Sequence, residues 1–311
     1  MQRILLPFLG GLAALGVSSA LAGDLGPLIT PAELVAAGGA QAPVILDIRA
    51  KGFDQGHIEG AISAPYGLFR GPAENPGAVP PLAQLEATYE QLGLAPERPV
   101  VIVSQGDTDT DFGAAARVYW TLKSSGFGDL AVLNGGATAW VNAGLPLSTA
   151  AVTPAPTDLH ITWQDAWTAD TPAVARVVAG TDQGKLIDAR PTPFFEGQKA
   201  HEAAARPGTL PGAQSLPYTE FFRPGATAIG ADSNGADLKA RLGISTGDEV
   251  VAFCNTGHWA ATDWFALSEL AGIENVKLYP GSMVEYSQTD GEMANQPGLL
   301  ANLLNQLAGG N

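Results

Sequence analysis

The same set of motifs occurs twice in this chain, in the same order and at a nearly constant offset. Four blocks take part, and ordered matches of this kind do not arise by chance. The period is far longer than that of solenoid repeats, so the pattern predicts a duplicated domain. The matched blocks are residues 44–49 with 185–190, 56–66 with 208–218, 100–104 with 250–254, and 133–136 with 278–281.

Each copy alternates short apolar runs with segments that are typical of helices. Residues 44–48, 100–103 and 130–133 are expected as buried strands, and residues 81–92 and 113–125 as helices. This alternation predicts the α/β class, with two tandem domains that each contain a mainly parallel sheet flanked by helices. Ligands bind such sheets beyond the carboxyl ends of the strands.

The two ends of the chain differ from the repeated part. Residues 1–22 have a short basic start, an apolar stretch and an Ala-x-Ala site, which predicts a signal peptide cleaved after Ala22. We therefore expect a periplasmic or secreted protein, with an N-terminal membrane anchor as the alternative. The expected domains are residues 23–150 and 159–290, joined by a Pro-rich linker at 151–158 and followed by a C-terminal tail helix at 291–311.

The composition restricts the possible partners. Of the 311 residues, 31 are acidic and 16 are basic, which gives a formal net charge of −15. Nucleic acid is not an expected partner, because phosphate contacts need clusters of Lys and Arg. No membrane contact is expected once the signal peptide is removed. An anionic substrate needs a local positive site, because the overall field of the protein repels it.

The single cysteine, Cys254, lies where an apolar strand ends and a short loop leads into a helix that is expected to begin near Trp259. One cysteine cannot form an internal disulfide. Loop amides and a helix N-terminus at such a position stabilise an anionic sulfur. Cys254 is therefore the candidate nucleophile, and an inert buried thiol is the alternative.

Taken together, these motifs resemble a tandem-domain rhodanese, a sulfurtransferase, over nearly the whole mature chain. The resemblance rests on Asp-x-Arg after a strand (188–190 and 47–49), the Gly-His-Ile-x-Gly-Ala box at 56–61, the Cys254 loop, and a glycine turn after the last strand. It implies that Cys254 takes a sulfane sulfur from a small anionic donor such as thiosulfate and passes it, as a persulfide, to cyanide or a thiol. It also implies a catalytically silent first domain, because Ser104 replaces the cysteine there.

Residues after the cysteine are the expected substrate contacts. Their backbone N–H groups are expected to hold the anionic sulfur, and Gly257 lets the loop curl tightly. His258 is expected to add a positive charge or a hydrogen-bond donor, although capping the helix is an equal alternative. For Trp259 packing is the favoured role, but its position directly after His258 makes it the candidate for lining the mouth of the pocket. The loop set is Asn255, Thr256, Gly257, His258 and Trp259.

The pair that precedes the second Gly-rich box is the other expected part of the site. Arg190 is the candidate for orienting an anionic donor, because a guanidinium matches oxyanions, and Asp188 is expected to support it. A purely structural pair is the alternative, since residues 47–49 repeat the motif in the silent copy.

The Cys254 loop departs from both familiar forms of the family. Thiosulfate enzymes tend to carry basic residues directly after the cysteine, and mercaptopyruvate enzymes a second arginine where this chain has Phe194. Thiosulfate or a similar donor is favoured. A 3-mercaptopyruvate sulfurtransferase and a sulfur carrier without turnover of its own are the alternatives. A phosphatase is not expected, because Ala260 replaces the arginine of the Cys-x5-Arg loop.

No cofactor and no metal are expected. Residues 107–111 imitate the start of a calcium loop, but Phe112 replaces the required glycine and Val118 the last glutamate. Zinc is not expected from one cysteine and four scattered histidines.

Overall fold

The computed structural model describes residues 25–39, 42–230 and 235–298. The signal peptide expected at 1–22 lies outside these ranges, as does most of the expected tail helix. The described start of that tail, residues 291–298, contains no helix, because Ala294 pairs with Thr209 in an antiparallel bridge. No helix therefore begins at residue 291, and the rest of the expected tail helix, residues 299–311, lies outside the described ranges. Within the described ranges, no helix combines the length and the apolar character needed to cross a membrane.

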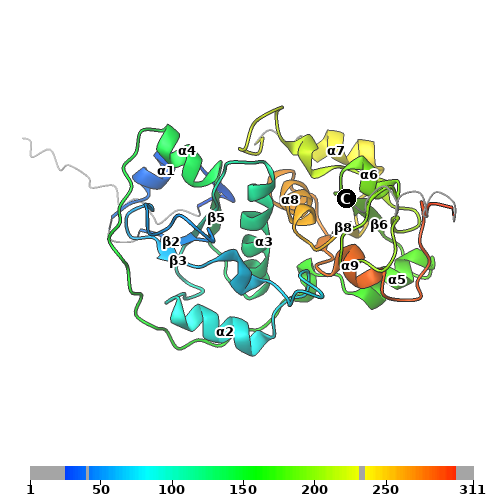
Figure 1. Ribbon diagram of the computed structural model, residues 1–311, viewed down its shortest axis with the longest axis horizontal. Helices are drawn as coiled ribbons and strands as arrows, with labels where there is room; N and C mark the ends of the chain where they lie inside the picture. Colours follow the sequence, from blue (N-terminus) through cyan, green and yellow to red (C-terminus); the bar gives the residue numbers. More distant parts are fainter. Residues whose placement is uncertain (1–24, 40–41, 231–234, 299–311) are drawn as a thin grey trace, which may run out of the picture.

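The first domain is built on a parallel sheet in the order β1-β5-β4-β2-β3 (Figure 1). Its inner strands are runs of Val, Ile and Leu because helices cover both faces. The expected strands and helices are confirmed to within a few residues. The elements are β1 (Leu28–Ile29), α1 (Pro31–Ala36), β2 (Val44–Asp47), β3 (Ile62–Ser63), η1 (Tyr66–Phe69), α2 (Leu82–Gln91), β4 (Val100–Val103), α3 (Thr110–Ser124), β5 (Leu130–Leu133) and α4 (Gly136–Asn142).

The second domain repeats this plan with a parallel sheet in the order β7-β6-β8-β9. A π-helical turn, η4, continues α8. The elements are η2 (Asp165–Trp167), α5 (Thr171–Val178), β6 (Lys185–Asp188), α6 (Thr192–Phe195), β7 (Gln214–Ser215), η3 (Tyr218–Phe221), α7 (Gly235–Leu242), β8 (Val250–Phe253), α8 (Trp259–Phe265), η4 (Ala266–Leu270), β9 (Val276–Leu278) and α9 (Ser282–Tyr286).

The pairing of strands in the two sheets corrects one of the four block matches between the repeats. β4 begins opposite the first residue of β5, and β8 begins opposite the first residue of β9. Counted from these strands, Gly136 corresponds to Ser282, and not to Gly281 as the sequence match predicts. Both residues have left-handed backbones, with φ of 60° and 51°. The match was wrong by one residue because Gly-Gly and Pro-Gly turns look alike in sequence.

The chain between the two sheets is attached to the first domain. Thr157 donates its backbone N–H to the carbonyl of Glu90 at 3.1 Å and its hydroxyl to the carbonyl of Leu94 at 2.7 Å. Further along, the N–H of Ile161 donates to the Glu86 carboxylate at 3.0 Å. The expected linker therefore runs along α2 and its C-terminal turn.

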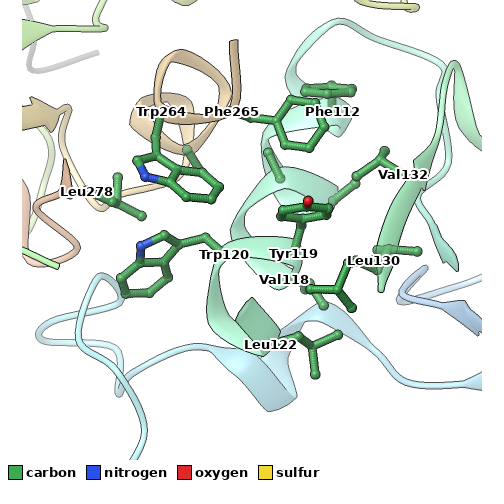
Figure 2. Packing of buried hydrophobic residues seen from close by; sticks show 14 of the residues in the cluster. Phe112, Val118, Tyr119, Trp120, Leu122, Leu130, Val132, Trp264, Phe265 and Leu278 are labelled. Atoms are coloured by element: carbon green, nitrogen blue, oxygen red, sulfur yellow. The ribbon is translucent and has the colours of Figure 1, made fainter. Parts of the chain in front are cut away.

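Helices α3 and α8 lie between the two sheets and pack against each other (Figure 1). Figure 2 shows the aromatic side chains at their contact, where the ring centroid of Phe265 lies 5.3 Å from Phe112 and 5.0 Å from Tyr119. One hydrophobic cluster contains residues of both domains, so the interface is continuous with the core. At Gly113 a Cβ atom would lie 2.8 Å from the carbonyl of His258, so the glycine allows α3 to approach the Cys254 loop.

Candidate active site

Cys254 follows β8 directly and is the thiol at the base of a small pocket. Its exposure is 1 %, and the pocket volume is about 190 Å³. Thr110, from the start of α3 in the first domain, closes one side. The pocket therefore lies at the domain interface, beyond the carboxyl end of a central strand. Its lining residues are Thr110, His201, Cys254, Asn255, Thr256, His258 and Trp259.

The loop after Cys254 offers several backbone N–H groups without an acceptor. The N–H of Gly257 is taken, because it donates to the hydroxyl of Ser282 at 3.1 Å. No acceptor within the described ranges is found for the other amides of the loop and of the first turn of α8. These free donors belong to Asn255, Thr256, His258, Trp259 and Ala260. Such a set of donors suits an anionic sulfur or an oxyanion.

Ser282 ties the two ends of the loop together. Its Oγ accepts the backbone N–H of Cys254 at 3.0 Å as well as that of Gly257, and it donates to the carbonyl of Tyr279 at 2.8 Å. A left-handed backbone is unfavourable for a serine, so a specific contact is needed to hold it there. Ser282 thus has a positioning role in the loop. Its role was not found from the sequence because the match between the two repeats was shifted by one residue.

Asp188 and Arg190 form a buried ion pair beneath the loop. Their side chains are 0 % and 2 % exposed, and Arg190 Nη2 lies 2.6 Å from Asp188 Oδ2. Arg190 also donates to the carbonyl of Gly208 at 2.9 Å and, through Nη1, to Asn255 Oδ1 at 3.3 Å. The guanidinium is thus bound to protein groups and does not line the pocket. The geometry favours the structural alternative, in which Arg190 braces the loop through Asn255.

His258 connects the loop to the first domain. Its Nε2 lies 2.9 Å from the carbonyl of Thr110, which can only accept, so Nε2 carries the proton. Nδ1 therefore accepts from the hydroxyl of Tyr66 at 3.0 Å. Burial, reinforced by repulsion from Arg70, lowers the pKa of His258 to about 4. The imidazole is therefore neutral near pH 7, and the expectation that His258 adds a positive charge is wrong at that pH.

Trp259 lines the pocket and is fixed by its neighbours. Its ring stacks on Tyr218 with 5.3 Å between centroids, and its indole N–H donates to the hydroxyl of Thr110 at 2.8 Å. Phe194 meets the same ring edge-on at 5.9 Å. Phe194, Trp259 and Tyr218 therefore form an aromatic wall, which includes the position where the resemblance to mercaptopyruvate enzymes implies a second arginine.

Several residues of the site were not found from the sequence. Thr110, Tyr66, Arg70 and Arg117 come from the first domain, and nothing in a single sequence indicates which of its side chains reach the Cys254 loop. His201 lines the pocket and accepts the N–H of Ala203 on Nδ1 at 3.2 Å.

The equivalent loop of the first domain holds carboxylates where the second holds free amides. Asp111 Oδ2 accepts the N–H groups of Asp107 and Thr108 at 2.8 and 3.0 Å, and Asp107 accepts from the hydroxyl of Thr138 at 2.6 Å. The negative charge makes this loop unsuited to an anion. Among the described residues, no group of three or more His, Cys, Asp or Glu is arranged to hold a metal ion.

A buried carboxyl on α8, Asp263, has no hydrogen-bond partner within the described part of the chain. Burial, and then the negative charge of nearby groups, raise its pKa well above the usual value, so the folded protein holds it protonated. The unfolded chain ionises it above about pH 4, so this group costs stability at neutral pH and the cost disappears on acidification. We expect Asp263→Asn to raise the Tm at pH 7 by about 2–6 °C.

The pH dependence of the Asp263→Asn effect is its test. Thermal unfolding followed by circular dichroism at pH 7 and at pH 4 should give a clear gain at the first and almost none at the second. An equal gain at both values would show that ionisation of Asp263 is not the cause.

Comparison with known proteins identifies the family of the two domains. The family model for the rhodanese-like domain matches residues 30–143 and 173–289. A thiosulfate sulfurtransferase of Azotobacter vinelandii is 31 % identical over 261 residues, which cover 83 % of this chain and 93 % of that protein. The sulfur carrier protein TtuD of Thermus thermophilus is 30 % identical over 213 residues, covering 65 % and 72 %.

Solved structures show the same fold. The 3-mercaptopyruvate sulfotransferase SseA of Escherichia coli superposes with a TM-score of 0.70 at 21 % identity, covering 83 % of this chain and 98 % of that one. A complex of EanB with ergothioneine gives a TM-score of 0.75 at 18 % identity, covering 88 % and 71 %. With two matched domains and curated relatives at 30 % identity or more, this chain belongs to the rhodanese family of sulfurtransferases.

Proposed function

We propose that the protein transfers a sulfane sulfur from thiosulfate, or a similar anionic donor, to cyanide or a thiol through a persulfide on Cys254. One observation carries this proposal. The only thiol of the chain lies at the base of a pocket whose loop presents amide N–H groups that have no acceptor among the described residues. An anionic sulfur, and the oxyanion of a donor, supply the acceptors that these groups lack.

The chemistry follows in two displacements. The Cys254 thiolate attacks the outer sulfur of thiosulfate, a new S–S bond forms, and the S–S bond of the donor breaks so that sulfite leaves with the electron pair. Cyanide then attacks the outer sulfur of the persulfide, thiocyanate leaves, and the thiolate is regenerated. The protein holds sulfur as an anion at each stage, which is the task of the loop amides.

Thiosulfate is preferred over 3-mercaptopyruvate because of the aromatic wall. Phe194 and Trp259 pack together where a carboxylate would need a cation. We expect thiosulfate to give the larger kcat/KM in a thiocyanate assay on the mature protein, with 3-mercaptopyruvate as the matched donor. A larger value for 3-mercaptopyruvate would reverse the assignment of donor and leave the persulfide intact.

A sulfur carrier is the second candidate. The pocket, at about 190 Å³, is smaller than typical small-molecule sites, and the relative from Thermus thermophilus is named as a sulfur carrier. In that case the persulfide forms readily, but small acceptors discharge it slowly. Comparing the rates of persulfide formation and of discharge by cyanide distinguishes a carrier from an enzyme that turns over.

We also propose that the protein is exported. The support is the sequence of residues 1–22, which has a basic start, an apolar stretch and an Ala-x-Ala site. N-terminal sequencing of the protein recovered from the periplasm or the medium tests this, with Gly23 as the expected first residue.

A further inference from the structure

Two arginines of the first domain, Arg117 in contact with the Cys254 loop and Arg70 near its His258, have no anionic partner among the described residues. Arg117, on α3, is 0 % exposed, and its Nη2 and Nη1 donate to the carbonyls of Gly77 at 2.8 Å and Gly257 at 3.5 Å. Its Nε has no acceptor in the described structure. Arg70 donates to the hydroxyl of Tyr66 at 3.0 Å and lies over the same ring. Within the described ranges, neither arginine forms an ion pair.

Among the described residues, the lack of a counter-ion is unusual for an arginine as deeply buried as Arg117. Acidic residues outnumber basic ones by 31 to 16. The two other deeply placed arginines, Arg49 and Arg190, each pair with an aspartate two residues earlier, at 2.7 and 2.6 Å. An unpaired buried charge is costly. Burial, together with repulsion from Arg70, lowers the pKa of Arg117 to about 9, and the guanidinium is still charged at pH 7.

We propose that Arg117, assisted by Arg70, is the counter-ion of the anionic sulfur that Cys254 carries as thiolate and as persulfide. The domain without a cysteine thus supplies the cationic part of the active site. This inference rests on the proposed function, because it concerns the same sulfur. It also accounts for a loop whose first two residues after the cysteine, Asn255 and Thr256, carry no positive charge.

The contact between Arg117 and the carbonyl of Gly257 places the positive charge next to the Cys254 loop. The carbonyl of Gly257 and the N–H of His258 belong to one peptide group, so a cation at the carbonyl polarises the N–H and makes it a stronger donor. A Cβ on Gly257 would lie 2.5 Å from Arg117 Nη1, and φ is 66°. Glycine at this position therefore allows both the turn of the loop and the approach of Arg117.

Three of the titratable or charged groups around the loop do not cancel the field of the two arginines. Arg190 is neutralised by Asp188, His258 is neutral near pH 7, and Asp263 is held protonated. His201 lines the pocket mouth, and Asp109 and Asp111 lie at the start of α3. Both aspartates keep their negative charge, which opposes that of the arginines, but within the described ranges neither forms an ion pair with Arg117 or Arg70. Asp111 accepts loop amides, and Asp109 accepts the hydroxyl of Tyr218 at 3.3 Å.

The test is the pH dependence of Cys254 alkylation by iodoacetamide in the full chain. The thiolate displaces iodide and forms a thioether, and the single cysteine makes the signal specific. In Arg117→Met we expect the midpoint of the rate profile to rise by about one pH unit, which slows alkylation below the midpoint about tenfold. Arg70→Gln should give a smaller rise in the same direction. Arg117→Lys, which keeps the charge, should stay near the wild type.

Asn75→Ala is the matched control for the interface. Asn75 donates to the Glu285 carboxylate across the same interface at 2.8 Å, and its loss changes no charge at the cysteine. The inference is overturned if folded Arg117→Met and Arg70→Gln keep the wild-type midpoint, or if Asn75→Ala shifts it equally. If Arg117→Met does not fold, the alkylation midpoints of Arg70→Gln and Arg117→Lys still test the inference. It then predicts a raised midpoint in Arg70→Gln and a midpoint near that of the wild type in Arg117→Lys.

Failure of the proposed function is visible separately. If the wild type forms neither a persulfide nor thiocyanate, sulfur transfer is refuted whatever the alkylation profiles show. If it forms both and the profiles of the arginine variants do not move, only the counter-ion role is refuted.

Discussion

Cys254→Ser is expected to reduce thiocyanate formation from thiosulfate and cyanide by at least about 1,000-fold, to the background without enzyme. Serine keeps the size of the side chain, but its hydroxyl is not ionised near neutral pH and cannot hold a sulfane sulfur. The loop itself should survive, because its bonds to Ser282 are made by backbone N–H groups of residues 254 and 257. The measurement is initial rate at saturating donor, with circular dichroism as a check on folding.

A matched control comes from the first domain. Ser104 occupies the equivalent strand end, so the double variant Cys254→Ser with Ser104→Cys places a thiol in the silent loop. We expect no recovery of activity, because Asp111 occupies the amides of that loop. Residual transfer in Cys254→Ser alone would mean that another nucleophile carries the reaction.

Ser282→Ala is expected to lower kcat/KM for the same reaction by about 10- to 100-fold. The change removes one acceptor that two buried N–H groups share, which leaves both unpaired and loosens the ends of the loop. The loop amides must be placed before the anion arrives, so disorder there reduces transition-state stabilisation. Rates as a function of thiosulfate concentration measure the effect.

Ser282→Gly distinguishes the effect of losing the hydroxyl from the effect of the left-handed backbone. Glycine relieves the left-handed conformation at φ 51°, as Gly136 does in the first domain, but it supplies no acceptor. We expect kcat/KM of Ser282→Gly to be about as low as that of Ser282→Ala. If Ser282→Gly retained full activity, the hydroxyl would not be what organises the loop.

Much of the fold was accessible from the sequence because the duplication is long and its strands are apolar. Runs such as 100–103 and 250–253 are buried on both faces and correspond to β4 and β8. The position of Cys254 at the end of such a strand follows from the parallel-sheet rule. What propensity cannot supply is the exact match of short turns, and for that reason Ser282 was missed.

The side chains around the cysteine were less accessible, because their roles depend on partners far away in the chain. Arg190 was expected to contact the donor, but Asp188 and Asn255 occupy its guanidinium. His258 was expected to add a positive charge or a hydrogen-bond donor, but burial against the other domain, reinforced by repulsion from Arg70, keeps it neutral near pH 7. The first outcome follows from contacts within the second domain and the second from packing between domains, and neither leaves a periodic pattern in the sequence.

The most direct test of the account is the intact mass of the wild-type protein after exposure to thiosulfate without an acceptor. We predict a gain of one sulfur atom, its removal by cyanide with release of thiocyanate, and no gain in Cys254→Ser. A sulfur atom retained by Cys254→Ser, or no gain in the wild type with either thiosulfate or 3-mercaptopyruvate, would contradict a persulfide on Cys254.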